Sequence, residues 1–436
     1  MDQNRVWGQK SPEPPGEEAR PQPRLRAVNR CQMVLRPTDV EQLIEAHHPA
    51  RAIWEIVGQQ NLDGFLEAIE AVEGVAGRSA WDPRLLISVW IYAYTTGVSS
   101  AREIFRLCRY HPAYQWLTGL KEINHHTLSD FRVAHQQALN ELFVQILGVL
   151  SYEGLITLER VMHDGTKVKA WAAGKSFRRK ETLEKHLEAA RQQVEEMGDP
   201  RSEEVSERVA KAQERAGREK QERLEAALEE LQQLQAEARS KKQKPPRVSA
   251  TDPEARVMKM PDGGYRPAFN VQFATTTDKQ VIVGVSVTNR GTEGDEAPPM
   301  LAQVKERTEQ QPKDYLIDGG QATLGTVDKL SGAGVTVYAP TQPPRGSKRT
   351  QAEPRPTDSP AVAAWRARMA TREAKAIYKE RAATSECANA RVRQHGLYQF
   401  VVRGIAKVTC VALWLAITHD LLRWMALVSG GQGSIG

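Results

Sequence analysis

The chain has 436 residues, of which 40% are hydrophobic and 26% are charged, and its formal net charge is +6. At about 100–200 residues per domain, this length suits two to four domains. The four cysteines form no Cys-x-x-Cys pair, which excludes a disulfide-rich mini-protein and argues against a zinc ribbon or a redox dithiol. No signal-peptide pattern opens the chain and no apolar run reaches about 18 residues, so we expect a cytoplasmic protein without a membrane span.

The positive charge is concentrated at the C-terminal end. Residues 341–436 hold 15 Lys and Arg against six Asp and Glu. A basic quarter on a near-neutral body indicates an anionic partner, with nucleic acid as the first candidate. A solubilising surface is the simpler alternative.

The first third of the chain predicts a tail followed by helices. Residues 1–34 are rich in Pro, Glu, Arg and Gln and poor in apolar residues, which predicts a disordered tail. In residues 35–153 apolar positions recur at three- and four-residue steps, which predicts an all-α domain. Asp82 and Pro83 form a helix start, and the apolar segment that follows predicts the centre of that domain.

A charged block, residues 174–247, holds 18 Lys and Arg against 16 Asp and Glu. Its early apolar positions follow the four-three-four spacing of a coiled-coil seam: Leu183, Leu187, Ala190, Val194 and Met197. The Gly-Asp-Pro sequence at 198–200 breaks this run. We therefore predict an inserted antiparallel helical hairpin, which we interpret as a spacer arm rather than a catalytic element. Dimerisation and DNA contact are alternative roles for such an arm.

Residues 154–173 and 248–428 predict the second folded domain. The expected elements are a strand (156–163), a strand hairpin (269–287), a helix (296–310), a strand (315–317), a helix (322–330), a strand (335–339) and helices over 361–395 and 405–428. This order predicts a mixed sheet flanked by helices, so the fold class is α+β. Residues 429–436 predict a flexible tail.

Two acidic residues lie at predicted strand ends. Asp164 and Asp318 are each followed by Gly. Carboxylates at the ends of neighbouring strands can converge on Mg²⁺, and two such ions about 4 Å apart support phosphodiester chemistry. Ordinary turn chemistry also explains an Asp-Gly pair.

A third acid, Glu386, lies in a predicted helix with the spacing Tyr378-x2-Arg381-x4-Glu386-x6-Arg393. Residues three, four or seven apart share a helix face, so Glu386 aligns with Arg393 and Tyr378 aligns with Arg381. One carboxylate among cations suits a metal site beside a phosphate backbone. Surface ion pairs are the alternative.

These motifs resemble the bacterial insertion-sequence transposases of the DDE class, in the branch with an all-α N-terminal domain and an RNase H-like catalytic domain. The similarity covers about residues 35–428. It rests on five segments in the family's order: WDPRLLISVWIYAYTTG with HHTLSDFR, DGTKVKA, TDPEARVMK with GGYRPAFNVQ, YLIDGG, and the Tyr-Arg-Glu-Arg spacing at 378–393.

The resemblance implies a catalytic, metal-binding triad of Asp164, Asp318 and Glu386, holding two ions of Mg²⁺ or Mn²⁺. It implies that Tyr378, Arg381 and Arg393 contact the phosphates of double-stranded DNA. The expected reaction is nicking at the element's ends, followed by attack of the freed 3′-hydroxyl on target DNA. A homodimer in the DNA complex is implied as well.

Further sequence features limit these expectations. No Gly-x-x-x-x-Gly-Lys-Ser/Thr motif is present, so no nucleotide cofactor is expected. Trp171, Gln321 and Cys387 depart from the family's usual residues. An inactive DNA-binding relative and a coiled-coil interaction protein are the alternatives, although the second leaves the three acids unexplained.

Overall fold

The computed structural model describes residues 31, 33, 35, 37–72, 74, 79–197, 207–237, 245–292, 294–341 and 353–432. The chain divides into two units, Met1–Asp39 and Val40–Gly436, and the following account concerns the second. Most of the predicted N-terminal tail lies outside the described residues.

The N-terminal region is all-helical, as predicted. Its elements are η1 (Val40–Leu43), α1 (Pro49–Gly58), α2 (Asp63–Leu66), α3 (Pro83–Thr95), α4 (Ala101–Tyr110), α5 (Pro112–Thr118), α6 (His125–Ala134) and α7 (Gln136–Tyr152). The Asp82 side chain caps α3 by accepting a hydrogen bond from the Arg84 N–H. Helix α3 is buried along most of its length, and its Trp90 donates a 3.0 Å hydrogen bond to the Leu128 carbonyl of α6.

The second region is built on a six-stranded mixed sheet. Its strands are β1 (Arg160–Lys169), β4 (Arg256–Lys259), β5 (Tyr265–Thr276), β6 (Ile282–Thr288), β7 (Asp314–Leu316) and β8 (Thr336–Tyr338). The order is β4-β5-β1-β7-β8, with β6 also paired to β5. Strand β1 is antiparallel to β5 and parallel to β7, which is parallel to β8. The fold is therefore α+β with a mixed sheet, and it agrees with the expected RNase H-like class.

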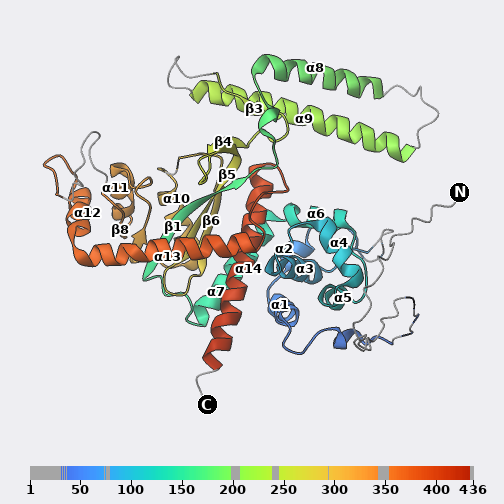
Figure 1. Cartoon of the computed structure of the whole chain (residues 1–436), viewed down its shortest axis with the longest axis horizontal. Coiled ribbons are helices and arrows are strands. Elements are labelled where there is room, and N and C mark those ends of the chain that lie inside the picture. Colours follow the sequence, from blue (N-terminus) through green and yellow to red (C-terminus); the bar gives the residue numbers. More distant parts are fainter. Residues whose placement is uncertain are drawn as a thin grey trace, which may run out of the picture. The chain divides into compact units, whose positions relative to one another are not determined.

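Helices cover this sheet, and one of them also contacts the N-terminal helices. The covering elements are α10 (Ala297–Thr308), α11 (Leu324–Gly332), α12 (Pro360–Ala370), α13 (Arg372–Gln394) and α14 (Ile405–Gln432). Helices α10 and α14 pack on β6, whereas α13 packs on β1 and β5 (Figure 1). Helix α14 also packs on α3 and α7, so it contacts both regions.

Within the described residues, α14 is the one helix long and apolar enough to cross a membrane by length and composition alone. However, 72% of its apolar window is buried inside the protein. Its Trp414 is buried and donates a 3.0 Å hydrogen bond to the Arg132 carbonyl of α6. Helix α14 is therefore packed as a core helix.

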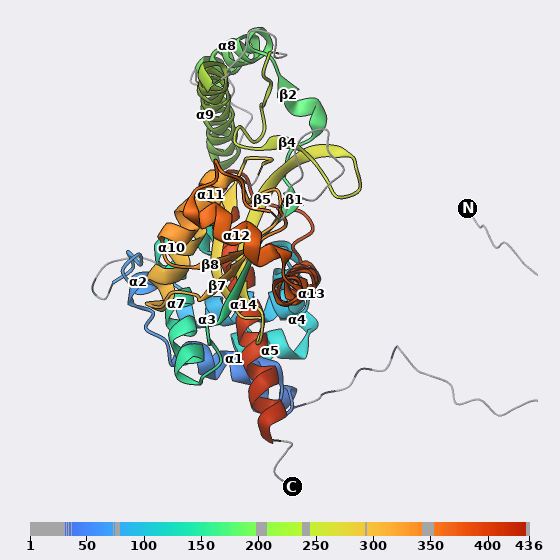
Figure 2. The ribbon, with the colours of Figure 1, turned by 90° about the vertical axis from the view of Figure 1, so that its left-hand side faces the viewer.

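The charged insertion forms a helical hairpin, α8 (Lys180–Met197) and α9 (Glu207–Glu237), with a two-stranded ribbon of β2 (Phe177–Arg178) and β3 (Val248–Ser249) at its base. The helices run antiparallel, and the hairpin lies beyond the β4 end of the sheet in both views (Figures 1 and 2). Its seam is a separate apolar cluster: Leu183, Leu187, Ala190, Leu224, Ala227, Leu231 and Val248.

Three predicted boundaries were wrong. The first strand begins later and runs to Lys169, because Leu158 has a left-handed backbone (φ 47°) and because β5 supplies pairing partners as far as Ala268. The predicted helix 361–395 is two helices, since Thr371 is extended (φ −71°, ψ 154°) and caps α13. The last helix continues to Gln432, beyond the predicted start of the tail at residue 429.

Candidate active site

Asp164 and Asp318 come together because of the register between two parallel strands. Strand β1 pairs with β7 so that Met162 lies beside Leu316. Asp164 and Asp318 each come two residues after this pair. Because the two chain segments run parallel, the same register places the two aspartates side by side. Asp164 thus lies inside β1 and not at a strand end, whereas Asp318 follows β7.

One guanidinium lies against both carboxylates. The Arg381 Nη2 atom is 2.7 Å from Oδ1 of Asp164 and 3.9 Å from Oδ1 of Asp318. The Arg381 and Asp164 side chains are 15% and 17% exposed, whereas that of Asp318 is 50% exposed. A cationic group therefore already balances the two aspartates at the surface of the sheet.

The second oxygen of Asp164 is also held from α13. Ser385 Oγ donates a hydrogen bond to Asp164 Oδ2, and Asn389 Nδ2 lies 3.5 Å from Ser385 Oγ. Arg381, Ser385 and Asn389 are four residues apart and so share one helix face. Ser385 is not among the residues predicted from the sequence, although its four-residue spacing from Arg381 was the available signal.

The other two predicted DNA-contacting residues also lie near β1. Arg393 Nη2 donates a 3.0 Å hydrogen bond to Oγ1 of Thr166, which follows Asp164 by two residues and shares its strand face. Tyr378 is half-buried, and burial raises the pKa of its phenol, which keeps it protonated at neutral pH. Contact of these residues and of Arg381 with DNA stays a prediction.

Glu386 is exposed on α13, and no recorded hydrogen bond or ion pair joins it to Asp164 or Asp318. Among the residues that the structure describes, no group of three His, Cys, Asp or Glu side chains is arranged to hold a metal ion. The structure therefore brings two of the three predicted acids together and leaves the third on the neighbouring helix.

An ion-pair network fixes α13 over the sheet. Arg160 of β1 contacts Glu380 of α13 at 2.7 Å and Asp314 of β7 at 3.3 Å. Glu380 also accepts a 3.0 Å hydrogen bond from Thr277, which follows β5. Glu380 is thus held from β1 and from the end of β5, while Asp314 holds Arg160, and these contacts set the position of the helix that carries Arg381 and Ser385.

His163 lies on the opposite sheet face from Asp164, as the alternation along a strand predicts. It is fully buried, and burial lowers the pKa of its imidazole to about 3. His163 is therefore neutral at physiological pH and faces away from the aspartate pair.

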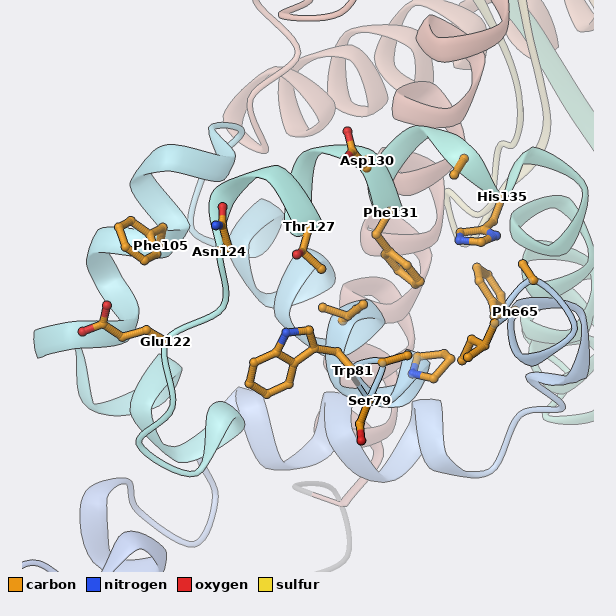
Figure 3. Close-up of a pocket in the computed structure, with 16 residues that line it drawn as sticks. Phe65, Ser79, Trp81, Phe105, Glu122, Asn124, Thr127, Asp130, Phe131 and His135 are labelled. Atoms are coloured by element: carbon orange, nitrogen blue, oxygen red, sulfur yellow. The ribbon is translucent and has the colours of Figure 1, made fainter. Parts of the chain in front are cut away.

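A cavity of about 640 Å³ lies elsewhere, among the N-terminal helices (Figure 3). Its walls include the aromatic side chains of Phe65, Trp81, Phe105 and Phe131, with Glu122 and Asp130 also lining it. None of the six predicted site residues lines this cavity. Its two acidic groups would repel phosphates.

Comparison with known families adds independent support. A family model described as "Transposase domain (DUF772)" matches residues 38–134, which include α1 to α6. A second, described as "Transposase DDE domain", matches residues 342–425, which include Glu386 and the α13 helix. No significant match was found among curated proteins or among solved structures. Together with the helical N-terminal region, the mixed sheet and the paired aspartates under α13, these two matches support an insertion-sequence DDE transposase.

Proposed function

We propose that the protein is a metal-dependent transposase that nicks DNA at the ends of an insertion sequence and joins the freed 3′-hydroxyl to target DNA. The observation that carries the proposal is that the Arg381 guanidinium lies against both Asp164 of β1 and Asp318, which follows the adjacent parallel strand β7. Glu386 points away from the aspartates, on the outward face of α13, so it would complete the triad only after this helix turns when DNA and metal bind.

The donor set fits a hard divalent ion. Two carboxylates lie within 3.9 Å of one positively charged atom, so their geometry already suits a shared cation. Asp164 and Asp318 would hold Mg²⁺ or Mn²⁺ through oxygen ligands, the type these ions prefer. When bound, such ions supply activation of the attacking oxygen and stabilisation of the leaving oxygen in phosphodiester chemistry.

The chain's own residues prepare this site. Arg381 compensates the two negative charges in the metal-free protein, and Ser385 keeps Asp164 in one orientation. When DNA binds, Arg381 would transfer its charge-assisted hydrogen bond from the carboxylates to a phosphate, which is a strong acceptor for a guanidinium. Two ends must be joined, so we propose that the working form is a homodimer on DNA.

The test is magnesium-dependent strand cleavage of a DNA that carries the element's own ends. Asp164→Ala, Asp318→Ala and Glu386→Gln should each lower cleavage by at least about 100-fold, the scale of losing a main transition-state-stabilising group. Glu306→Gln, which removes an exposed glutamate on α10, is the matched control and should cleave normally.

Equal cleavage by the wild type and Asp164→Ala would reject the proposal. DNA binding without any cleavage by the wild type would instead identify an inactive relative.

A further inference from the structure

The outward face of α13 carries cations that the site described above does not use. We propose that Arg372, Lys375 and Lys379 bind successive phosphates of the DNA duplex and so lead its backbone to Glu386. The inference rests on the proposed function, because it assigns the DNA-binding surface of that same site. We call these three residues the α13 cation row.

The spacing of the α13 cation row aligns it with Glu386 along the helix. Arg372, Lys379, Glu386 and Arg393 are seven residues apart, and a straight α-helix drifts by only about 20° per heptad. Lys375 falls within the same arc of about 60°, at 3.6 residues per turn. Arg372, Lys375, Lys379 and Glu386 therefore project from one side of α13. Arg393, at the end of the helix, reaches back to Thr166 of β1 and is not part of this surface.

The row is exposed and its charges are not neutralised by neighbours. Arg372, Lys375 and Lys379 are all exposed. Within the described part of the chain, no hydrogen bond or ion pair is recorded for their side chains. Binding an external anion would therefore break no internal ion pair of the row.

The acids of α13 are kept apart from the row, except for Glu386. Glu373 and Glu380 lie on a different flank of the helix, about 80° or more from the row at 100° per residue. Glu380 is engaged with Arg160 and Thr277 of the sheet region. This separation of charge gives α13 one cationic side, which is the arrangement that attracts a polyanion.

Small residues lie beside Glu386 on the exposed part of α13. Ala382, Ala383 and Ala390 are all exposed. Their short side chains would let a DNA backbone approach close to Glu386, while the longer cationic side chains reach further out. The exposed face thus combines charge with space for close approach.

The length of this face matches about half a turn of DNA. Arg372 and Glu386 are 14 residues apart, which is about 21 Å at 1.5 Å per residue. That length corresponds to about six base pairs at 3.4 Å each. Contacts of this kind go to phosphates and position the duplex, so they should be independent of sequence.

Three cationic side chains of the α8–α9 hairpin, unlike the α13 cation row, are already paired with acidic side chains. Arg191, Arg215 and Arg218 are paired with Glu225, Glu219 and Glu214 at 3.0, 3.1 and 2.6 Å. A phosphate would have to displace those carboxylates first. The α13 cation row is therefore the better anion-binding surface, and the arm provides a matched control with the same number of charges.

The experiment measures binding of a duplex carrying the element's end to the full-length protein, without divalent metal, over a series of salt concentrations. The triple variant Arg372→Gln, Lys375→Gln, Lys379→Gln should reduce the salt slope, d log K/d log [salt], by two to three, at about 0.9 per phosphate contact. Its affinity should fall at least about tenfold at low salt. The single variant Lys379→Gln should reduce the slope by about one.

The control triple variant Arg191→Gln, Arg215→Gln, Arg218→Gln should keep the wild-type slope, and circular dichroism should report an unchanged fold for both. An unchanged slope for the α13 variants, or an equal loss for both triple variants, overturns the assignment. Such a result leaves the proposed function standing if cleavage still depends on Asp164, so the two failures are distinguishable.

Discussion

Arg381 and Ser385 contact different oxygens of the Asp164 carboxylate: Arg381 binds Oδ1, and Ser385 donates a hydrogen bond to Oδ2. Ser385→Ala should lower the affinity for Mn²⁺ or Mg²⁺ by about 10- to 100-fold, as is typical when a residue orienting a metal ligand is removed. Calorimetric titration with Mn²⁺ would measure this loss. Ser385→Thr keeps the hydroxyl and should retain most of the affinity, so equal losses for both variants would contradict the orienting role.

Arg381 should act as an internal counter-cation for the metal-free protein. Arg381→Gln leaves Asp164 and Asp318 facing each other without compensation, so we expect the metal-free variant to lose about 1–3 kcal/mol of stability. Added Mg²⁺ should then raise the melting temperature of the variant more than that of the wild type. Thermal unfolding with and without Mg²⁺ measures both effects, and identical metal-induced shifts would rule out the compensation.

Asp252 predicts a pH-dependent contribution to stability. It is fully buried, accepts a 3.2 Å hydrogen bond from the Gly404 N–H, and burial raises its pKa from 3.8 to about 6. Because the folded-state pKa is raised, this group's favourable contribution is complete below pH 3.8 and is lost as the pH rises through 6. Its ionisation in the fold therefore costs stability at neutral pH.

The variant Asp252→Asn cannot ionise, so its stability relative to the wild type should increase between pH 4 and pH 7, by up to roughly 3 kcal/mol. Urea unfolding of both proteins across this range is the measurement. A stability difference that does not change with pH would show that Asp252 ionises as easily in the folded protein as in the unfolded chain.

The α8–α9 hairpin should open independently of the sheet, because its seam is a separate apolar cluster. Leu231→Ala removes a fully buried seam side chain and should destabilise the hairpin by about 2–5 kcal/mol. Hydrogen exchange should accelerate in residues 180–237 and stay unchanged in β1. The control Val209→Ala alters an exposed position of α9. Faster exchange in β1 as well would mean that the arm and the sheet unfold together.

Local signals in the sequence predicted the parts of the fold that depend on neighbours in the chain. The Asp82 cap and the heptad seam of the arm are short-range patterns. The cap is present, and Leu183, Leu187 and Ala190 of the predicted seam are buried, whereas Val194 is only partly buried and the Met197 side chain lies outside the described residues. The extent of β1 depends on pairing with β5, about 100 residues later, so its end at Lys169 could not be read from the Asp-Gly turn signal.

In the candidate site, too, the contacts between distant parts of the chain could not be predicted from the sequence. The spacing around Glu386 located the helix, but which side of α13 faces the sheet depends on packing against β1 and β5. The inward position of Arg381 and the hydrogen bond from Ser385 therefore emerged only from the three-dimensional arrangement.

Helix α14 packs on α3 and α7 of the N-terminal helices and on β6 of the sheet, and one continuous hydrophobic core includes residues of both regions. Neither region can rotate against the other without separating buried side chains such as Trp414. The N-terminal helices consequently keep a fixed angle and distance to Asp164 and Asp318, so α14 works as a rigid strut between the two regions.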